Sequence, residues 1–149
     1  MEIFAAGSNL VTFGDGWHDQ LEGDPTSPHR WTVGLDASIR VPKITSNPLM
    51  RGALQIELDA VPYLPPNSVP YQDVLLFVDG TMASAIRLHD GDVKRLETDY
   101  PFPISQTPFS NIKFYLPQSA KPSFFGDGTD QRQLGIGLKS LKLTFLERF

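Results

Sequence analysis

The three histidines and the acidic side chains are the residues best suited to chemistry in this chain, which contains no cysteine. His18, His29 and His89 are scattered, without the close spacing of a helical zinc site. The sequence has no nucleophile elbow, phosphate-binding loop or dinucleotide fingerprint. Asp19 and Glu22 could mimic a glycosidase pair, but such pairs arise by chance, and glycosidases hold them in a deep cleft. We therefore expect no catalytic activity and no cofactor.

One stretch, GWHDQLEGDPTSPHRWTVG (16–34), concentrates aromatic and polar side chains and holds both tryptophans. A sugar ring has an apolar face of C–H groups and a rim of hydroxyls, so it stacks on an aromatic ring while polar side chains bind its rim. We expect Trp17 to be at least partly exposed and to stack on a pyranose; burial of Trp17 in the core is equally compatible with the sequence. The expected partners of the sugar hydroxyls are His18, Asp19, Glu22 and Arg30.

Trp31 opens an alternating, strand-like stretch with Val33, and this pattern favours burial. We expect its ring to fill a space in the core. On this interpretation, Trp31→Ala would cost roughly 3–5 kcal/mol of stability.

The loop Phe125–Arg132 (FGDGTDQR) carries Asp127 and Asp130, whose oxygens are suitable ligands for calcium. It lacks the full pattern of a calcium loop and a clear bidentate carboxylate. A turn in which both aspartates accept hydrogen bonds from nearby backbone amides is the favoured interpretation, and we expect no metal.

The net charge of −4 gives the chain no field that would attract polyanions. Nucleic acid and anionic membrane surfaces are therefore not expected partners. No apolar run approaches the length of a membrane span, and the N-terminus lacks the pattern of a signal peptide. A cytoplasmic location is the default expectation, and a domain taken from a larger or secreted protein would show the same sequence features.

Alternation with a period of two predicts strands along most of the chain. In Arg51–Ala60 the apolar residues fall on one face and the polar residues on the other, as in a strand with one face in water. Asp79-Gly80 predicts a tight hairpin turn. The last apolar segment, from Leu134 to Phe145, changes phase, so a bulge or kink near Lys139-Ser140 is expected.

With thirteen prolines and twelve glycines among 149 residues, the chain divides into short segments joined by turns. The sequence predicts a single all-β domain (1–149), folded as a two-sheet antiparallel β-sandwich.

The order of the motifs resembles that of a known group of proteins. Residues 16–42 show Gly-Trp, a following Glu, Trp-Thr, an alternating strand and Pro. Residues 111–143 show a strand, an Ala-Lys-Pro loop, Asp-Gln-Arg-Gln-Leu-Gly and a last strand. Together these resemble the small β-sandwich modules attached to bacterial glycosyltransferases and other enzymes of cell-surface polysaccharides. The pattern residues are Trp17, Glu22, Trp31, Asp130 and Arg132.

This resemblance implies a jelly-roll-like sandwich and a noncatalytic, carbohydrate-binding or accessory role in bacterial polysaccharide biosynthesis. An oligo- or polysaccharide and a protein such as a glycosyltransferase are the expected partners. It also suggests that Arg132 pairs with Glu22 or Asp130 and joins the two halves of the pattern. The alternative is an assembly module without sugar binding, which would dock through Pro-rich loops or through the strand face left nearly bare by Gly135 and Gly137.

Overall fold

The computed structural model describes residues 2–5, 12–42, 51–101 and 109–147. Antiparallel strands account for most of this part of the chain, and a single short 3₁₀ helix, η1, is found there. The elements are β1 (Glu2–Ala5), β2 (Thr12–Phe13), β3 (Arg30–Val33), β4 (Asp36–Pro42), β5 (Arg51–Pro62), β6 (Gln72–Val78), β7 (Thr81–Leu88), β8 (Lys94–Pro101), β9 (Phe109–Tyr115), η1 (Pro122–Phe125) and β10 (Leu134–Glu147).

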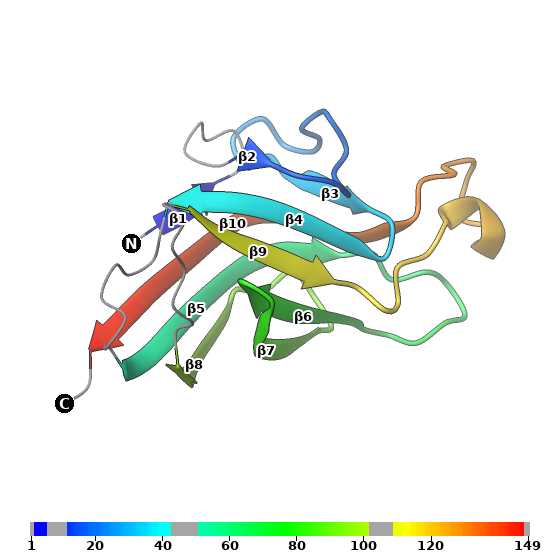
Figure 1. Ribbon diagram of the computed structural model, residues 1–149. Coiled ribbons are helices and arrows are strands. Elements are labelled where there is room, and N and C mark those ends of the chain that lie inside the picture. Colours follow the sequence, from blue (N-terminus) through cyan, green and yellow to red (C-terminus); the bar gives the residue numbers. More distant parts are fainter. Residues whose placement is uncertain (1, 6–11, 43–50, 102–108, 148–149) are drawn as a thin grey trace.

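The strands form two five-stranded sheets, which Figure 1 shows as two layers. One sheet has the order β1-β10-β5-β8, with β3 pairing with the first part of β10. The other has the order β2-β4-β9-β6-β7. The all-β, two-sheet sandwich predicted from the sequence is confirmed.

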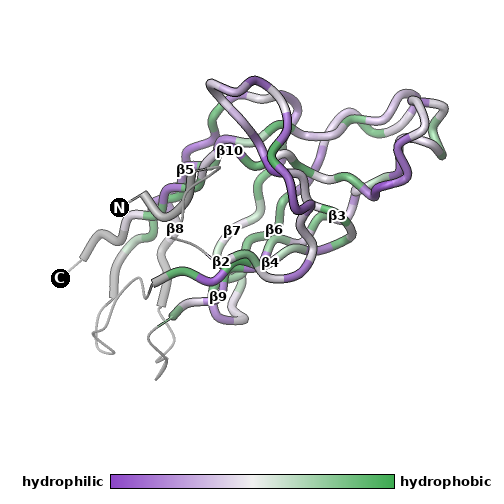
Figure 2. Tube along the Cα trace, turned by 90° about the horizontal axis from the view of Figure 1, so that it is seen from above, coloured by the Kyte–Doolittle hydropathy of each residue, from purple (hydrophilic) through white to green (hydrophobic). Residues whose placement is uncertain are grey.

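The core lies between the two sheets and is built by alternation, because successive side chains of a strand point to opposite faces. Four strands, β4, β5, β6 and β9, turn every second residue inward, as the sequence predicts for Arg51–Ala60. Figure 2 shows hydrophobic residues along the strands and hydrophilic ones in the long loop between β2 and β3. The largest fully buried side chains are Phe114, Ile39, Leu54, Ile56, Leu58, Leu76, Leu88, Ile112, Leu116, Ile136 and Leu138.

The hairpin turn predicted at Asp79-Gly80 joins β6 to β7. Both residues have positive φ angles, 48° and 85°, as the two central positions of a type I′ turn require. Val78 and Thr81 face each other on either side of it. Asp79 also ties the turn to β9, because its carboxylate accepts a hydrogen bond of 2.8 Å from the backbone N–H of Asn111.

The phase change in β10 is a bulge. The register with β5 shifts between Leu138 and Ser140, at the place predicted from the sequence. This extra residue lets Leu138 and Leu141 both face the core, and both are fully buried. The side chain of Phe145, the last residue of that apolar segment, lies outside the part that is described.

None of the helical structure in the described residues is long and apolar enough to span a membrane.

Candidate functional site

Trp17 is held in place by packing and by a hydrogen bond. Its ring meets the rings of Phe13 and Phe114 edge to face, with centroids 5.2 and 5.8 Å apart, and it packs against the core. Its indole N–H donates a hydrogen bond of 2.8 Å to the backbone carbonyl of Ser38. The residue is partly buried. Trp17 therefore attaches the long loop to β4, and the stacking role expected from its sequence remains a prediction.

Trp31 does not fill the core, so the sequence-based expectation for this residue is wrong. It is only partly buried and is absent from the core cluster. The reason is the register of β3: Thr32 is fully buried, and its hydroxyl oxygen accepts a hydrogen bond of 3.0 Å from the N–H of Ile136. Because neighbours in a strand point to opposite faces, Trp31 lies on the outer face.

The ring of His29 covers the outer face of β10 at Gly137. A Cβ atom added at Gly137 would lie 2.6 Å from Cδ2 of His29, so only glycine leaves room for this ring. His29 also meets Trp31 edge to face at 5.2 Å. Burial lowers the pKa of His29, with the carboxylate of Glu22 acting in the opposite direction and Lys139 adding to the lowering.

The bare strand face at Gly135 and Gly137 is therefore not open for a partner, contrary to the expectation from the sequence. At Gly135 an added Cβ would meet Leu116 and Thr32 at 2.9–3.1 Å, and both glycines are buried. The chain's own side chains already pack closely there.

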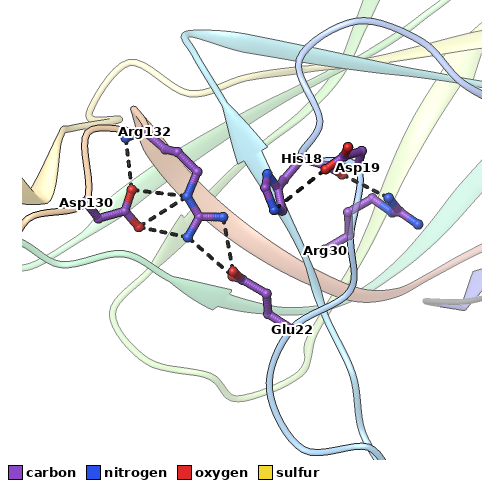
Figure 3. Close-up of polar contacts among 6 residues, drawn as sticks. All are labelled: His18, Asp19, Glu22, Arg30, Asp130 and Arg132. Carbon is purple, nitrogen blue, oxygen red and sulfur yellow. Dashed lines mark hydrogen bonds and ion pairs between the residues drawn. The ribbon is translucent and has the colours of Figure 1, made fainter.

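Arg132 joins the two halves of the sequence pattern. Its guanidinium contacts Asp130 Oδ2 at 2.7 Å through Nη2 and Glu22 Oε1 at 3.2 Å through Nη1 (Figure 3). It pairs with both expected partners. Hydrogen bonds from Arg132 hold the pKa of Asp130 below its usual value. This network attaches the loop between β2 and β3 to the loop that precedes β10.

Of the remaining predicted sugar-binding residues, Arg30 is engaged in contacts within the protein and Asp19 is exposed to solvent. The guanidinium of Arg30 lies 4.4 Å from the ring centre of Phe13, and it donates a hydrogen bond of 2.9 Å to the backbone carbonyl of His18. Arg30 thus contributes to packing. Asp19 is 87% exposed, and its carboxylate is 3.8 Å from Nε2 of His18. Figure 3 shows these two side chains next to each other on the loop.

The aspartates considered for calcium have protein partners. Asp127 accepts a hydrogen bond of 2.9 Å from the hydroxyl of Tyr63. Asp130 accepts a hydrogen bond of 2.9 Å from the backbone N–H of Arg132 and also forms the ion pair with its guanidinium. Asp130 thus follows the expected turn, whereas Asp127 bonds a side chain from another loop. Burial, together with Asp127, raises the pKa of Tyr63 to about 12. Among the described residues, no group of three acidic or histidine side chains is placed to hold a metal ion.

The loop and β3 present one set of side chains on the same outer face. Trp17 and Thr32 form a bridge pair, and the N–H of His18 donates to the carbonyl of Trp31, so His18 and Trp31 lie side by side outside the sandwich. Glu22 and His29 form the next bridge pair. We call this set the outer loop surface; its residues are His18, Glu22, His29, Trp31 and Arg132.

Comparisons with known proteins agree with the architecture. No protein-family model matches the sequence, and no curated protein matches it. Among solved structures, the chain is similar to a family 35 carbohydrate-binding module from Clostridium thermocellum, with 10% identity and a TM-score of 0.54, over 95% of this chain and 97% of that one. It is also similar to the CBM36-1 domain of a multidomain xylanase from the hindgut metagenome of Trinervitermes trinervoides. That match has 9% identity and a TM-score of 0.52, over 96% of this chain and 94% of that one. What the two structures share with this chain is the fold.

The sequence did not predict how the rings of this loop are placed: Trp17 packs against the core and Trp31 lies on the outer face. His29 was missed as a member of the surface, although the bare glycines of β10 indicated that some group packs closely there. Its pairing with Glu22 across the loop is a long-range consequence of the fold and has no local signal.

Proposed function

We propose that this chain is a noncatalytic carbohydrate-binding module and that the outer loop surface is where it binds sugar. The observation that carries the proposal is the placement of a partly exposed Trp31 beside His18 and His29 on one face, with Glu22 paired to His29. Binding residues concentrate in loops that a rigid scaffold holds. Here Trp17 and Arg132 hold the loop at both of its sides.

In this proposal the pyranose stacks on Trp31, and the sugar hydroxyls bond to His18, Asp19 and Glu22. Trp17 and Arg30 act by positioning, because the indole N–H of Trp17 bonds Ser38 and Nη1 of Arg30 bonds the carbonyl of His18. The stacking role predicted for Trp17 from the sequence is thus assigned to Trp31 in this proposal. The neutral imidazole that burial favours at His29 can accept as well as donate a hydrogen bond. A shallow site of this kind binds weakly, on the order of 0.1–1 mM, because few contacts offset the loss of translational freedom.

The wider role that we propose is in the metabolism of bacterial surface polysaccharides, where the module would serve a partner such as a glycosyltransferase. The resemblance of the motifs in residues 16–42 and 111–143 supports this role. The alternative is an assembly module that does not bind sugar, and the Pro-rich loops would then be its docking sites.

The test is a chemical-shift titration with a panel of bacterial surface oligosaccharides. We expect the amide shifts to gather in residues 17–33 and 130–133, and Trp31→Ala to abolish them. Phe124→Ala is the matched control, because Phe124 is 78% exposed on η1 and lies outside the outer loop surface. Unchanged binding by a folded Trp31→Ala variant would refute this site. Stable capture of a glycosyltransferase without sugar would favour the assembly role.

A further inference from the structure

The outer face of the β2-β4-β9-β6-β7 sheet carries an apolar hollow that shares no residue with the outer loop surface. It has a volume of about 520 Å³ and opens to solvent, and this volume lies in the range of small-molecule sites. Its lining comes from β6, β9 and the turn between β6 and β7: Leu75, Phe77, Gly80, Asn111, Lys113 and Tyr115.

The hollow follows from a sequence feature of β6. Its segment DVLLFV (73–78) is apolar at nearly every position, although only Val74, Leu76 and Val78 are needed to face the core. Leu75 and Phe77 therefore point outward, where a strand facing only water would carry polar residues. Both are partly exposed, and Tyr115, which faces Leu75 across the ladder, is 37% exposed.

Lys113, the charged residue of this lining, is paired, and so are Arg87 and Asp73 on the neighbouring strands β7 and β6. Lys113 Nζ lies 3.3 Å from Asp36 Oδ2, and Arg87 Nε lies 2.8 Å from Asp73 Oδ1. The face therefore offers an apolar floor with hydrogen-bonding groups at its edge and little unbalanced charge. This complements an uncharged, amphipathic ligand better than a charged one.

A second copy of this chain fits the hollow less well. Two identical concave faces placed against each other would enclose a void, whereas protein interfaces are packed as densely as protein interiors. Each copy also carries a net charge of −4, which opposes association. A ligand that enters the hollow is the better occupant.

We propose that this sheet face is a second binding surface, for an internal segment of an uncharged polysaccharide chain. The ring of Tyr115 and the outward side of Phe77 stack on the C–H faces of the sugars, and the side chains of Asn111 and Lys113 bond hydroxyl groups. The proposal extends beyond the outer loop surface, because it uses different residues on the other sheet and can hold whether or not that surface binds.

The experiment is isothermal titration of the whole chain with neutral hexasaccharides, namely cellohexaose, xylohexaose, mannohexaose and maltohexaose. We expect at least one to bind with millimolar affinity, and Tyr115→Ala to weaken that binding about tenfold, as for an aromatic anchor. Phe124→Ala, whose side chain lies on η1 outside both surfaces, should leave it unchanged. Trp31→Ala is titrated alongside, to separate binding at the sheet face from binding at the outer loop surface. Amide shifts on titration should map to β6 and β9.

The outcomes separate the two proposals. If all four hexasaccharides fail to bind, or if binding is lost in Trp31→Ala and kept in Tyr115→Ala, the sheet-face proposal is wrong and the outer loop surface is unaffected. If Tyr115→Ala loses hexasaccharide binding and Trp31→Ala keeps it, the sheet face is supported as the binding site. These sugars are then not ligands of the outer loop surface. A doubling of mass in solution that Tyr115→Ala abolishes would assign the face to a second copy and overturn the proposal.

Discussion

Removing Trp17 should destabilise the protein far more than removing Trp31, because only Trp17 packs against the core. Truncation of a buried tryptophan lowers the free energy of unfolding by about 3–5 kcal/mol. Because Trp17 is only partly buried, we expect Trp17→Ala to cost about 3 kcal/mol. This cost includes the loss of the edge-to-face contacts with Phe13 and Phe114 and of the hydrogen bond to Ser38. The hydrogen bond accounts for about 1 kcal/mol, so Trp17→Phe, which keeps a ring, should cost about that much.

For Trp31→Ala we expect a cost of about 1 kcal/mol, since the ring lies on the outer face. Urea denaturation of the three variants measures these differences directly, provided that the slope with urea concentration is unchanged. In thermal unfolding, Trp17→Ala should melt about 6–12 °C below the parent. If Trp31→Ala proved to be the more destabilised protein, the assignment of core and surface tryptophans would be refuted.

Three further perturbations follow from the same contacts. Gly137→Ala should cost about 1–3 kcal/mol, because the new methyl group collides with His29, and most of this loss should be recovered in the double variant with His29→Ala. Burial lowers the pKa of His29 in the folded protein, so as the pH falls the unfolded chain takes up a proton at this histidine before the folded chain does. The contribution of the neutral His29 to the free energy of unfolding is therefore fully present above pH 6.5 and is lost as the pH falls through the lower native pKa. Urea midpoints of wild type and His29→Gln, measured across that pH range, should show this loss. For Arg132→Met, which leaves Asp130 and Glu22 without their cation, a loss of about 1 kcal/mol at pH 7 is expected. Because Arg132 lowers the pKa of Asp130, that loss should shrink as acid protonates the carboxylate, and an equal loss at pH 2 and pH 7 would contradict the ion-pair explanation.

Local patterns were sufficient for three features of this fold, namely one strand, one hairpin turn and one bulge. Period-two alternation placed the strand at Arg51–Ala60, the pair Asp79-Gly80 placed the hairpin, and the change of phase placed the bulge at Lys139. Each of these signals depends only on neighbours in sequence. The pairing of Arg132 with Glu22 or Asp130 was expected only through the resemblance of the motifs, and the structure shows both contacts.

The tryptophans show where local reasoning fails. Whether Trp31 faces in or out depends on the one-residue register of a four-residue strand, and the buried hydroxyl of Thr32 decides it. The sequence Trp-Thr-Val does not show that a threonine would occupy the inner position, since threonine more often lies at the surface. In the same way, the apolar segment DVLLFV (73–78) does not show by itself that Leu75 and Phe77 line an open hollow.

The central claim, that sugar is bound at the outer loop surface, is tested most directly by tryptophan fluorescence, because the chain has only two tryptophans. The Trp17→Phe variant leaves Trp31 as the single reporter, and Trp31→Phe leaves Trp17. We predict that titration with the oligosaccharide bound by the parent changes the emission of the Trp31 reporter, with a midpoint of order 0.1–1 mM, and leaves the Trp17 reporter almost unchanged. A response confined to Trp17, or no response from either reporter while the sugar still binds, would contradict the account.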